Sequence, residues 1–259
     1  YKAFLNEIQW VGYMLYRYNS YKVENKVTKV FDYEYFKLES VTTTDSLIVD
    51  LKVGENEEAL FFTLQGDAEI NGLKLNTFDM YYMPPGFNAK LIISPNSVAY
   101  IARSWAETVF KPYVKRYVDG KRIKTGVMPY NRTVITMIGE DDPANSFIAG
   151  YVEGSAGNWT SYPPHKHDEK PEAYIFYGLN PGFAVQLIIS DEFEEAYVVH
   201  DYDVVLIPKG YHPNVPSTIN SVNYAWVIAA PKGKRDLTVD YHPAFKNLPI
   251  GPQSHIRAR

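Results

Sequence analysis

The stretch Asp79-Met-Tyr-Tyr-Met-Pro-Pro-Gly-Phe-Asn88 returns in similar form as Asp203-Val-Val-Leu-Ile-Pro-Lys-Gly-Tyr-His212, at an offset of 124 residues. Both copies run from an acidic residue through an apolar segment to a proline and a glycine. Upstream, Glu58-Ala-Leu-Phe-Phe62 matches Glu172-Ala-Tyr-Ile-Phe176 at an offset of 114 residues. Matches that recur in the same order indicate a duplicated unit. We therefore predict two similar domains, with about ten extra residues between the blocks of the second copy.

The chain around these blocks is typical of short strands joined by tight turns. Alternating runs rich in β-branched residues occur at 46–53 and 184–189, and turn residues such as Asn71-Gly72 recur between such runs. This pattern predicts a sandwich or a barrel. We expect an all-β protein with an N-terminal domain over residues 1–130, which includes a polar connector from about Lys111, and a C-terminal domain over residues 131–259.

The composition excludes several classes of function. The 259 residues include 26 Lys and Arg against 30 Asp and Glu, and the net charge of −4 disfavours a large nucleic-acid-binding surface. The chain has no cysteine, so disulfides, thiolate catalysis and cysteine-based metal sites are excluded. No apolar run approaches the roughly 18 residues that a membrane-spanning helix needs. We expect a cytoplasmic protein that binds neither nucleic acid nor membrane.

Residue types that bind metals are concentrated in the second copy. Two histidines, His165 and His167, flank Lys166, and Glu172 follows five residues later. Residues i and i+2 of a strand point to the same face, so the two histidines are expected to project together while Lys166 points away. A turn over residues 168–171 would bring Glu172 back onto the neighbouring strand.

A third histidine is expected to reach the same place. His212 follows the turn signal Pro208-Lys-Gly210, which predicts a third strand end. Three imidazoles and one carboxylate suit Zn, Mn, Fe, Co or Ni. The matching positions in the first copy are Leu51, Val53 and Asn88, which are not metal ligands of this type. The sequence therefore predicts one divalent metal per chain, in the second domain.

The combined pattern His-x-His-x4-Glu and Pro-x-Gly-x-His resembles that of the cupin superfamily. Tyr202 stands where a glycine often opens the second motif, and one residue rather than two separates Gly210 from His212. Residues 157–168 and 194–213 more closely resemble 5-deoxy-glucuronate isomerase, an enzyme of inositol breakdown. The resemblance implies two tandem cupin barrels (double-stranded β-helix, or jelly-roll) and a zinc ion held by His165, His167, Glu172 and His212.

A sister branch, 5-keto-4-deoxyuronate isomerase of pectin breakdown, is similar in other features. The short gap between His167 and Glu172 and the run 172–177 resemble this branch more. Either resemblance implies a metal-dependent aldose–ketose isomerase that acts on a deoxy-uronate sugar acid.

A carboxylate substrate needs a basic partner, and one is missing from the expected place. The inositol branch typically has Gln-Arg where this chain has Gln186-Leu187. Lys209 and Arg132 are the other candidate cations, unless both are solvated surface residues.

The isomerisation also needs a group that moves a proton between neighbouring carbons. Tyr174 shares a strand face with Glu172 by the period of two, which makes it the candidate. Gln186 is a candidate hydrogen-bond partner for sugar hydroxyls, and Trp226 is a candidate pocket wall. Core packing or barrel lining is the alternative for all three.

Two other functions suit the same residues. Three histidines and one glutamate also hold iron or copper in cupin dioxygenases, and a sugar-binding double cupin would need no catalysis at all. Because exposed sheet edges need cover, we expect a homo-oligomer. The three remaining histidines lie in turn-like or irregular segments and are expected not to be ligands: His200, His242 and His255.

Overall fold

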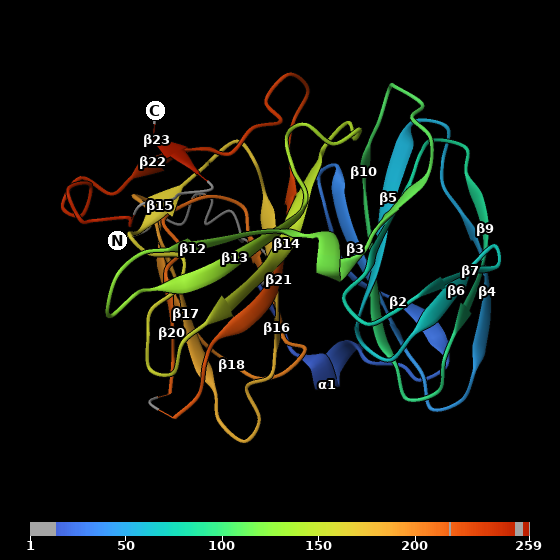
Figure 1. Ribbon diagram of the computed structural model, residues 1–259, viewed down its shortest axis with the longest axis horizontal. Helices are drawn as coiled ribbons and strands as arrows, with labels where there is room; N and C mark the ends of the chain where they lie inside the picture. Colours follow the sequence, from blue (N-terminus) through green and yellow to red (C-terminus); the bar gives the residue numbers. More distant parts are fainter. Residues whose placement is uncertain (1–13, 218, 252–255, 259) are drawn as a thin grey trace, which may run out of the picture.

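The computed structural model describes residues 14–217, 219–251 and 256–258. In these ranges the only helical elements are one short α-helix, α1 (Tyr18–Tyr21), and one 3-10 turn, η1 (Tyr117–Asp119). Two large sheets pack against each other at the centre, and smaller sheets close each of them into a barrel (Figure 1). The prediction of an all-β chain with two tandem barrels is confirmed. No helix in the described ranges has the length and apolar character to cross a membrane.

The first barrel consists of a six-stranded and a four-stranded sheet, in which all pairings are antiparallel. The large sheet has the spatial order β11 (Tyr113–Lys115), β8 (Met80–Met83), β5 (Glu57–Gln65), β10 (Val98–Trp105), β3 (Phe36–Thr42) and β2 (Lys26–Tyr33). The smaller sheet has the order β4 (Leu47–Lys52), β9 (Asn88–Ile93), β6 (Ala68–Ile70) and β7 (Leu73–Leu75).

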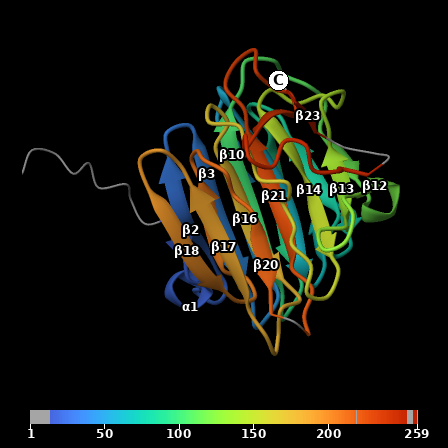
Figure 2. The ribbon, with the colours of Figure 1, turned by 90° about the vertical axis from the view of Figure 1, so that its left-hand side faces the viewer.

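The second barrel consists of a seven-stranded sheet and two three-stranded sheets. The large sheet has the order β1 (Leu15–Tyr16), β19 (Val204–Ile207), β16 (Glu172–Tyr177), β21 (Asn223–Ala229), β14 (Phe147–Gly154), β13 (Arg132–Ile138) and β12 (Lys121–Thr125). The small sheets are β18 (Glu194–Val199), β17 (Ala184–Ile189) and β20 (Asn214–Pro216), and β15 (His165–Lys166), β22 (Thr238–Tyr241) and β23 (Arg257–Ala258). Figure 2 shows that the strands of the two large sheets have similarly tilted axes, with neighbouring strands antiparallel.

Alternation of side chains along the central strands divides the core into three parts. Leu60 of β5 and Ile175 of β16 belong to the cluster that both large sheets share. Their neighbours Phe61 and Tyr174 belong to separate clusters, one inside each barrel. Because successive strand residues point to opposite faces, Glu172 faces the interior of the second barrel together with Tyr174.

The predicted connector is part of the sheets. Strand β11 pairs with β8 of the first barrel, whereas β12 pairs with β13 of the second. Strand β1, from the start of the described chain, pairs with β19 of the second barrel. Strands β1 and β12 precede residue 130 in the sequence, but both belong to the second large sheet. The division of the chain after residue 130 therefore stays a prediction.

Candidate metal centre

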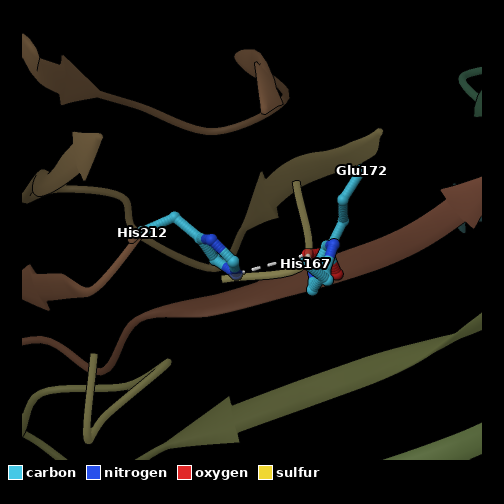
Figure 3. A group of neighbouring side chains, drawn as sticks. All are labelled: His167, Glu172 and His212. Carbon is cyan, nitrogen blue, oxygen red and sulfur yellow. Dashed lines mark hydrogen bonds and ion pairs between the residues drawn. The ribbon is translucent and has the colours of Figure 1, made fainter. Parts of the chain in front are cut away.

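Three of the four predicted ligands meet inside the second barrel. The ligand atoms of His167, Glu172 and His212 all lie within 4.8 Å of one another (Figure 3). Glu172 is the first residue of β16, His167 directly follows β15, and His212 lies between β19 and β20. All three side chains are buried. The three ligand side chains therefore come from separate strand ends of the second barrel.

Hydrogen bonds fix the tautomer of the imidazoles. The Nδ1 atoms of His165, His167 and His212 lie 3.0, 2.8 and 2.8 Å from backbone carbonyl oxygens two or three residues away. Because a carbonyl only accepts, each Nδ1 carries the proton, and Nε2 of the neutral ring has a free lone pair. Burial lowers the pKa of His212 to about 4 and that of His165 well below its usual value. Metal-binding histidines are held in the same way.

The facing atoms of the cluster fit a divalent cation. Nε2 of His167 lies 3.0 Å from Oε2 of Glu172, and Nε2 of His212 lies 3.4 Å from the same oxygen. His212 Nε2 is buried and forms no hydrogen bond. With the protons on Nδ1, these atoms present lone pairs to one another, so a proton or a cation must hold them together. Bonds of about 2.0–2.1 Å to a single ion place its ligands roughly 3 Å apart.

His165 lies beside this cluster of three. It is buried, and its ring centroid is 4.9 Å from that of His212. Lys166 points away, as the period of two predicts, and forms an ion pair with Asp168. His165 is not part of the group whose ligand atoms lie within 4.8 Å, so its membership of the metal site stays a prediction.

The loops that carry His167 and His212 are tied together. The predicted turn after His167 is present, with Lys170 N–H donating to the His167 carbonyl, and Asp168 Oδ1 accepts a hydrogen bond from Gly210 N–H at 2.8 Å. Gly210 has a φ of +97°, and a Cβ there would lie 2.9 Å from a carbonyl oxygen of β17. Only glycine tolerates this backbone conformation at so close a contact.

A cavity opens beside the cluster. Tyr174 and Trp226, the predicted catalytic and wall residues, both line it. The Tyr174 hydroxyl donates to Ser161 Oγ at 3.3 Å, and its ring stacks on Tyr224 with centroids 4.1 Å apart. Burial, and then the charge of Glu172, raises the pKa of Tyr174 well above its usual value, so the hydroxyl keeps its proton.

Gln186 does not line this cavity. Its side chain is fully buried, and its amide nitrogen donates to the carbonyls of Leu187 and His212, each at 2.9 Å. Its Oε1 accepts a hydrogen bond from Asn214. These contacts favour a role in holding the His212 loop over the predicted contact with sugar hydroxyls.

Two buried cations line the same cavity, Arg132, which is a candidate from the sequence, and Lys170, which is not. Lys170 Nζ donates to Asp236 Oδ1 at 2.9 Å and to the carbonyls of Asp236 and Thr238. Nothing in the sequence of the 168–171 turn marks a buried lysine. Arg132 is also buried there, whereas Lys209 forms a surface ion pair with Glu192.

The alignment of Glu58 with Glu172 is wrong by one residue. Ala59 pairs with Met83 on the neighbouring strand, and Glu172 pairs with Ile207 in the same way. The longer repeat block aligns Met83 with Ile207. Ala59 therefore occupies the position of Glu172, and Glu58 points to the other face of its sheet. Among the described residues, the second barrel holds the one cluster of three metal-ligand side chains.

Glu58 instead joins the two barrels. Its carboxylate accepts hydrogen bonds from the backbone N–H groups of Asn145, Ser146 and Phe147, the start of β14 and the loop before it. The Tyr82 hydroxyl donates to the same carboxylate at 2.8 Å.

The histidines expected to be non-ligands do not belong to the cluster where they are described. His200 is exposed. The His242 ring packs on Tyr211 and Phe245, with centroids 4.8 and 5.1 Å away. His255 lies outside the described residues.

Several known proteins are similar to this chain. A 5-deoxy-glucuronate isomerase of Geobacillus kaustophilus is 43% identical over 93 residues, which cover 32% of this chain and 34% of the relative. The Bacillus subtilis (strain 168) protein of the same name is 37% identical over 122 residues, which cover 42% of this chain and 45% of the relative. The matched segments thus span less than half the length of these relatives.

Solved structures show the fold. An IolB-like protein from Salmonella typhimurium LT2 superposes with a TM-score of 0.72 at 21% identity, covering 83% of this chain and 90% of the other. An oxalate decarboxylase of Lactobacillus farciminis gives a TM-score of 0.65 at 12% identity, covering 86% and 88%. The two tandem barrels are cupin barrels, as the sequence motifs predict. Residues 20–248 match the KduI/IolB family, and the chain therefore belongs to that family.

Proposed function

We propose that this chain is a metal-dependent aldose–ketose isomerase of a deoxy-uronate sugar acid, of the type that converts 5-deoxy-glucuronate to 5-dehydro-2-deoxy-gluconate. The observation that carries the proposal is the buried His167–Glu172–His212 cluster, of which His167 and Glu172 line a cavity. The names of the relatives support this reaction over the dioxygenase and the non-catalytic alternatives.

The metal would be held by the four residues that the sequence motif predicts: His165, His167, Glu172 and His212. We expect zinc, and Mn, Fe, Co and Ni suit the same donor set. When bound, such an ion polarises a substrate carbonyl and the hydroxyl beside it. The backbone hydrogen bonds at Nδ1 keep the rings oriented for this purpose before metal or substrate arrives.

Tyr174 contributes a proton at the cavity wall. Its hydroxyl stays protonated because burial and Glu172 raise its pKa, so it acts as a hydrogen-bond or proton donor to a substrate oxygen and not as the base. Trp226 forms part of the wall that excludes water, and Gln186 positions the His212 loop.

The experiment is an assay of the purified, metal-loaded protein on 5-deoxy-glucuronate and, separately, on 5-keto-4-deoxyuronate. Turnover of the first compound supports the proposal, and turnover of the second alone would move the chain to the pectin branch. Oxygen consumption without isomerisation would instead indicate a dioxygenase. Tyr174→Phe is expected to lower kcat while the bound metal stays at wild-type level.

The cytoplasmic location and the homo-oligomer belong to the same proposal. Light scattering of the purified protein tests the oligomer, and fractionation of the source cells tests the location.

A further inference from the structure

Arg132 is a buried cation that faces the proposed active site. It is the first residue of β13, is 6% exposed, and lines the cavity together with His165, His167 and Glu172. Among the described residues, no carboxylate forms an ion pair with it. Its charged and titratable neighbours are one histidine and four tyrosines: His165, Tyr224, Tyr174, Tyr241 and Tyr130. Burial of a cation without a counter-charge is costly, which calls for a partner that the described chain does not supply.

The hydrogen bonds of Arg132 leave one edge of its guanidinium free. Nη1 donates to the carbonyls of Tyr130 at 3.1 Å and Tyr162 at 2.7 Å. Nε and Nη2 donate to no group in the described part of the chain. These two N–H groups point in the same direction and form the two-pronged edge that matches a carboxylate.

Arg235 shows what a purely structural arginine looks like in the same barrel. All three of its nitrogens are used: Nε donates to Phe147 O at 2.8 Å, Nη1 to Glu140 O at 2.7 Å, and Nη2 to Gly139 O. Arg235 does not line the cavity. The difference between the two arginines lies in their free donors and in the direction they face.

Lys170, the other buried cation of the cavity, has no free donor with which to bind an anion. Its ammonium donates to Asp236 Oδ1 and to two backbone carbonyls, which uses all three of its N–H donors. The pair with Asp236 also balances its charge.

We propose that Arg132 binds the carboxylate of the sugar acid through its free Nε–Nη2 edge, and so selects acids over neutral sugars. This inference rests on the proposed function, since the metal cluster would hold the carbonyl end of the same molecule. A hydrogen-bonded charge pair of this kind is expected to strengthen binding by roughly 10- to 100-fold.

The test measures binding and needs no turnover. Metal-loaded protein is titrated with D-glucuronate and with its neutral amide, D-glucuronamide, by ligand-observed NMR. The wild type is expected to bind the acid at least about tenfold more tightly than the amide. Arg132→Met is expected to bind both equally weakly, with its metal content unchanged. Arg132→Lys keeps the charge but lacks the two-pronged edge, so it should recover only part of the preference.

The matched control is Arg235→Met, which should lower the melting temperature and leave the preference for the acid at its wild-type value. A wild type without preference, or an Arg132→Met protein that keeps it, would overturn the inference. Failure of the proposed function looks different: the wild type would turn over neither deoxy-uronate, while the charge-dependent binding and its loss in Arg132→Met would persist.

Discussion

Asp79 and Asp203 occupy the same position in the two barrels and make the same contacts. At Asp79 the carboxylate accepts hydrogen bonds from the Arg116 side chain and the Tyr117 N–H. At Asp203 it accepts them from the Arg17 side chain and the Tyr18 N–H. Each barrel therefore has an Arg-Tyr arm on the edge of its large sheet, although the arm of the second barrel comes from the start of the described chain.

The residues before the two aspartates are also similar in conformation and contacts. Phe78 and Tyr202 both have a positive φ, +70° and +65°, a conformation that bulky residues rarely adopt. Each ring packs on the tyrosine of its arm, Phe78 on Tyr117 and Tyr202 on Tyr18, with centroids 5.1 and 5.0 Å apart. These contacts explain why a tyrosine stands where the broad motif has glycine.

The two barrels differ in the side chains on their inner faces. Ala59 and Phe61 face an apolar core in the first barrel, whereas Glu172 and Tyr174 face the histidines and the cavity in the second. The two barrels therefore share a scaffold, and the chemistry of the second depends on a few side chains on its inner face.

The largest effect is expected at the ligands themselves. His212→Ala should abolish bound metal and lower turnover by about a thousandfold or more, because a Lewis acid contributes several kcal/mol to such a reaction. His165→Ala should do the same if it is the fourth ligand. Asn88→Ala, at the matching place in the first barrel, and His242→Ala should leave metal and turnover unchanged. Elemental analysis and the isomerase assay measure both, and metal retained in His212→Ala would contradict the assignment.

Substitution of Glu58 should lower stability, whereas substitution of Glu172 should remove the metal. Glu58→Ala leaves three backbone N–H groups unpaired, two of them buried, so we expect a loss of about 3–4 kcal/mol in the free energy of unfolding with the metal retained. Glu172→Ala should lose the metal. Denaturant unfolding and elemental analysis separate the two, and loss of metal in folded Glu58→Ala would show that the sequence alignment of the two glutamates has functional meaning after all.

The metal-free protein should become less stable as the pH is lowered. A histidine of the unfolded chain titrates near 6.5, whereas burial lowers the pKa of His212 to about 4 in the fold. Between these values the unfolded state binds the extra proton, so the free energy of unfolding should fall by about 2 kcal/mol from pH 7 to pH 5 through this residue. In His212→Gln this part of the pH dependence should disappear. An unchanged slope would mean that the ring is already protonated in the fold.

The smallest effect is expected at the tether between the two ligand loops. Asp168→Ala removes the hydrogen bond to Gly210 N–H and should weaken metal binding by about tenfold, without loss of fold. Glu169→Ala, which removes a neighbouring surface ion pair with Lys234, is the control. Competition with a chelator measures both affinities, and equal values in the two variants would exclude Asp168 as a positioning residue.

Much of this architecture could be predicted from local patterns. The period of two placed His165 and His167 on one face, and the repeated Asp79 and Asp203 blocks indicated two barrels. The one-residue error at Glu58 arose because a five-residue match cannot distinguish neighbouring registers, whereas a shift of one residue reverses the face of a strand.

The cations could not be assigned in this way. Lys170 is buried because Asp236 and Thr238, about 66 residues later, cover it with their oxygens. Arg132 faces the cavity because of how β13 joins the second large sheet. Such burial depends on long-range packing, which leaves no periodic trace in the sequence. The Arg-Tyr arms share only two residues, too few to be recognised as a repeat.

The most direct test of the account is the position of a metal ion in the protein. Crystals of metal-free protein, soaked with one equivalent of zinc or manganese, would be examined by anomalous diffraction at the absorption edge of the metal. We expect one peak per chain, in the second barrel between the side chains of His165, His167, Glu172 and His212. Density at any other place, or these four side chains surrounding no peak, would overturn the proposed metal site.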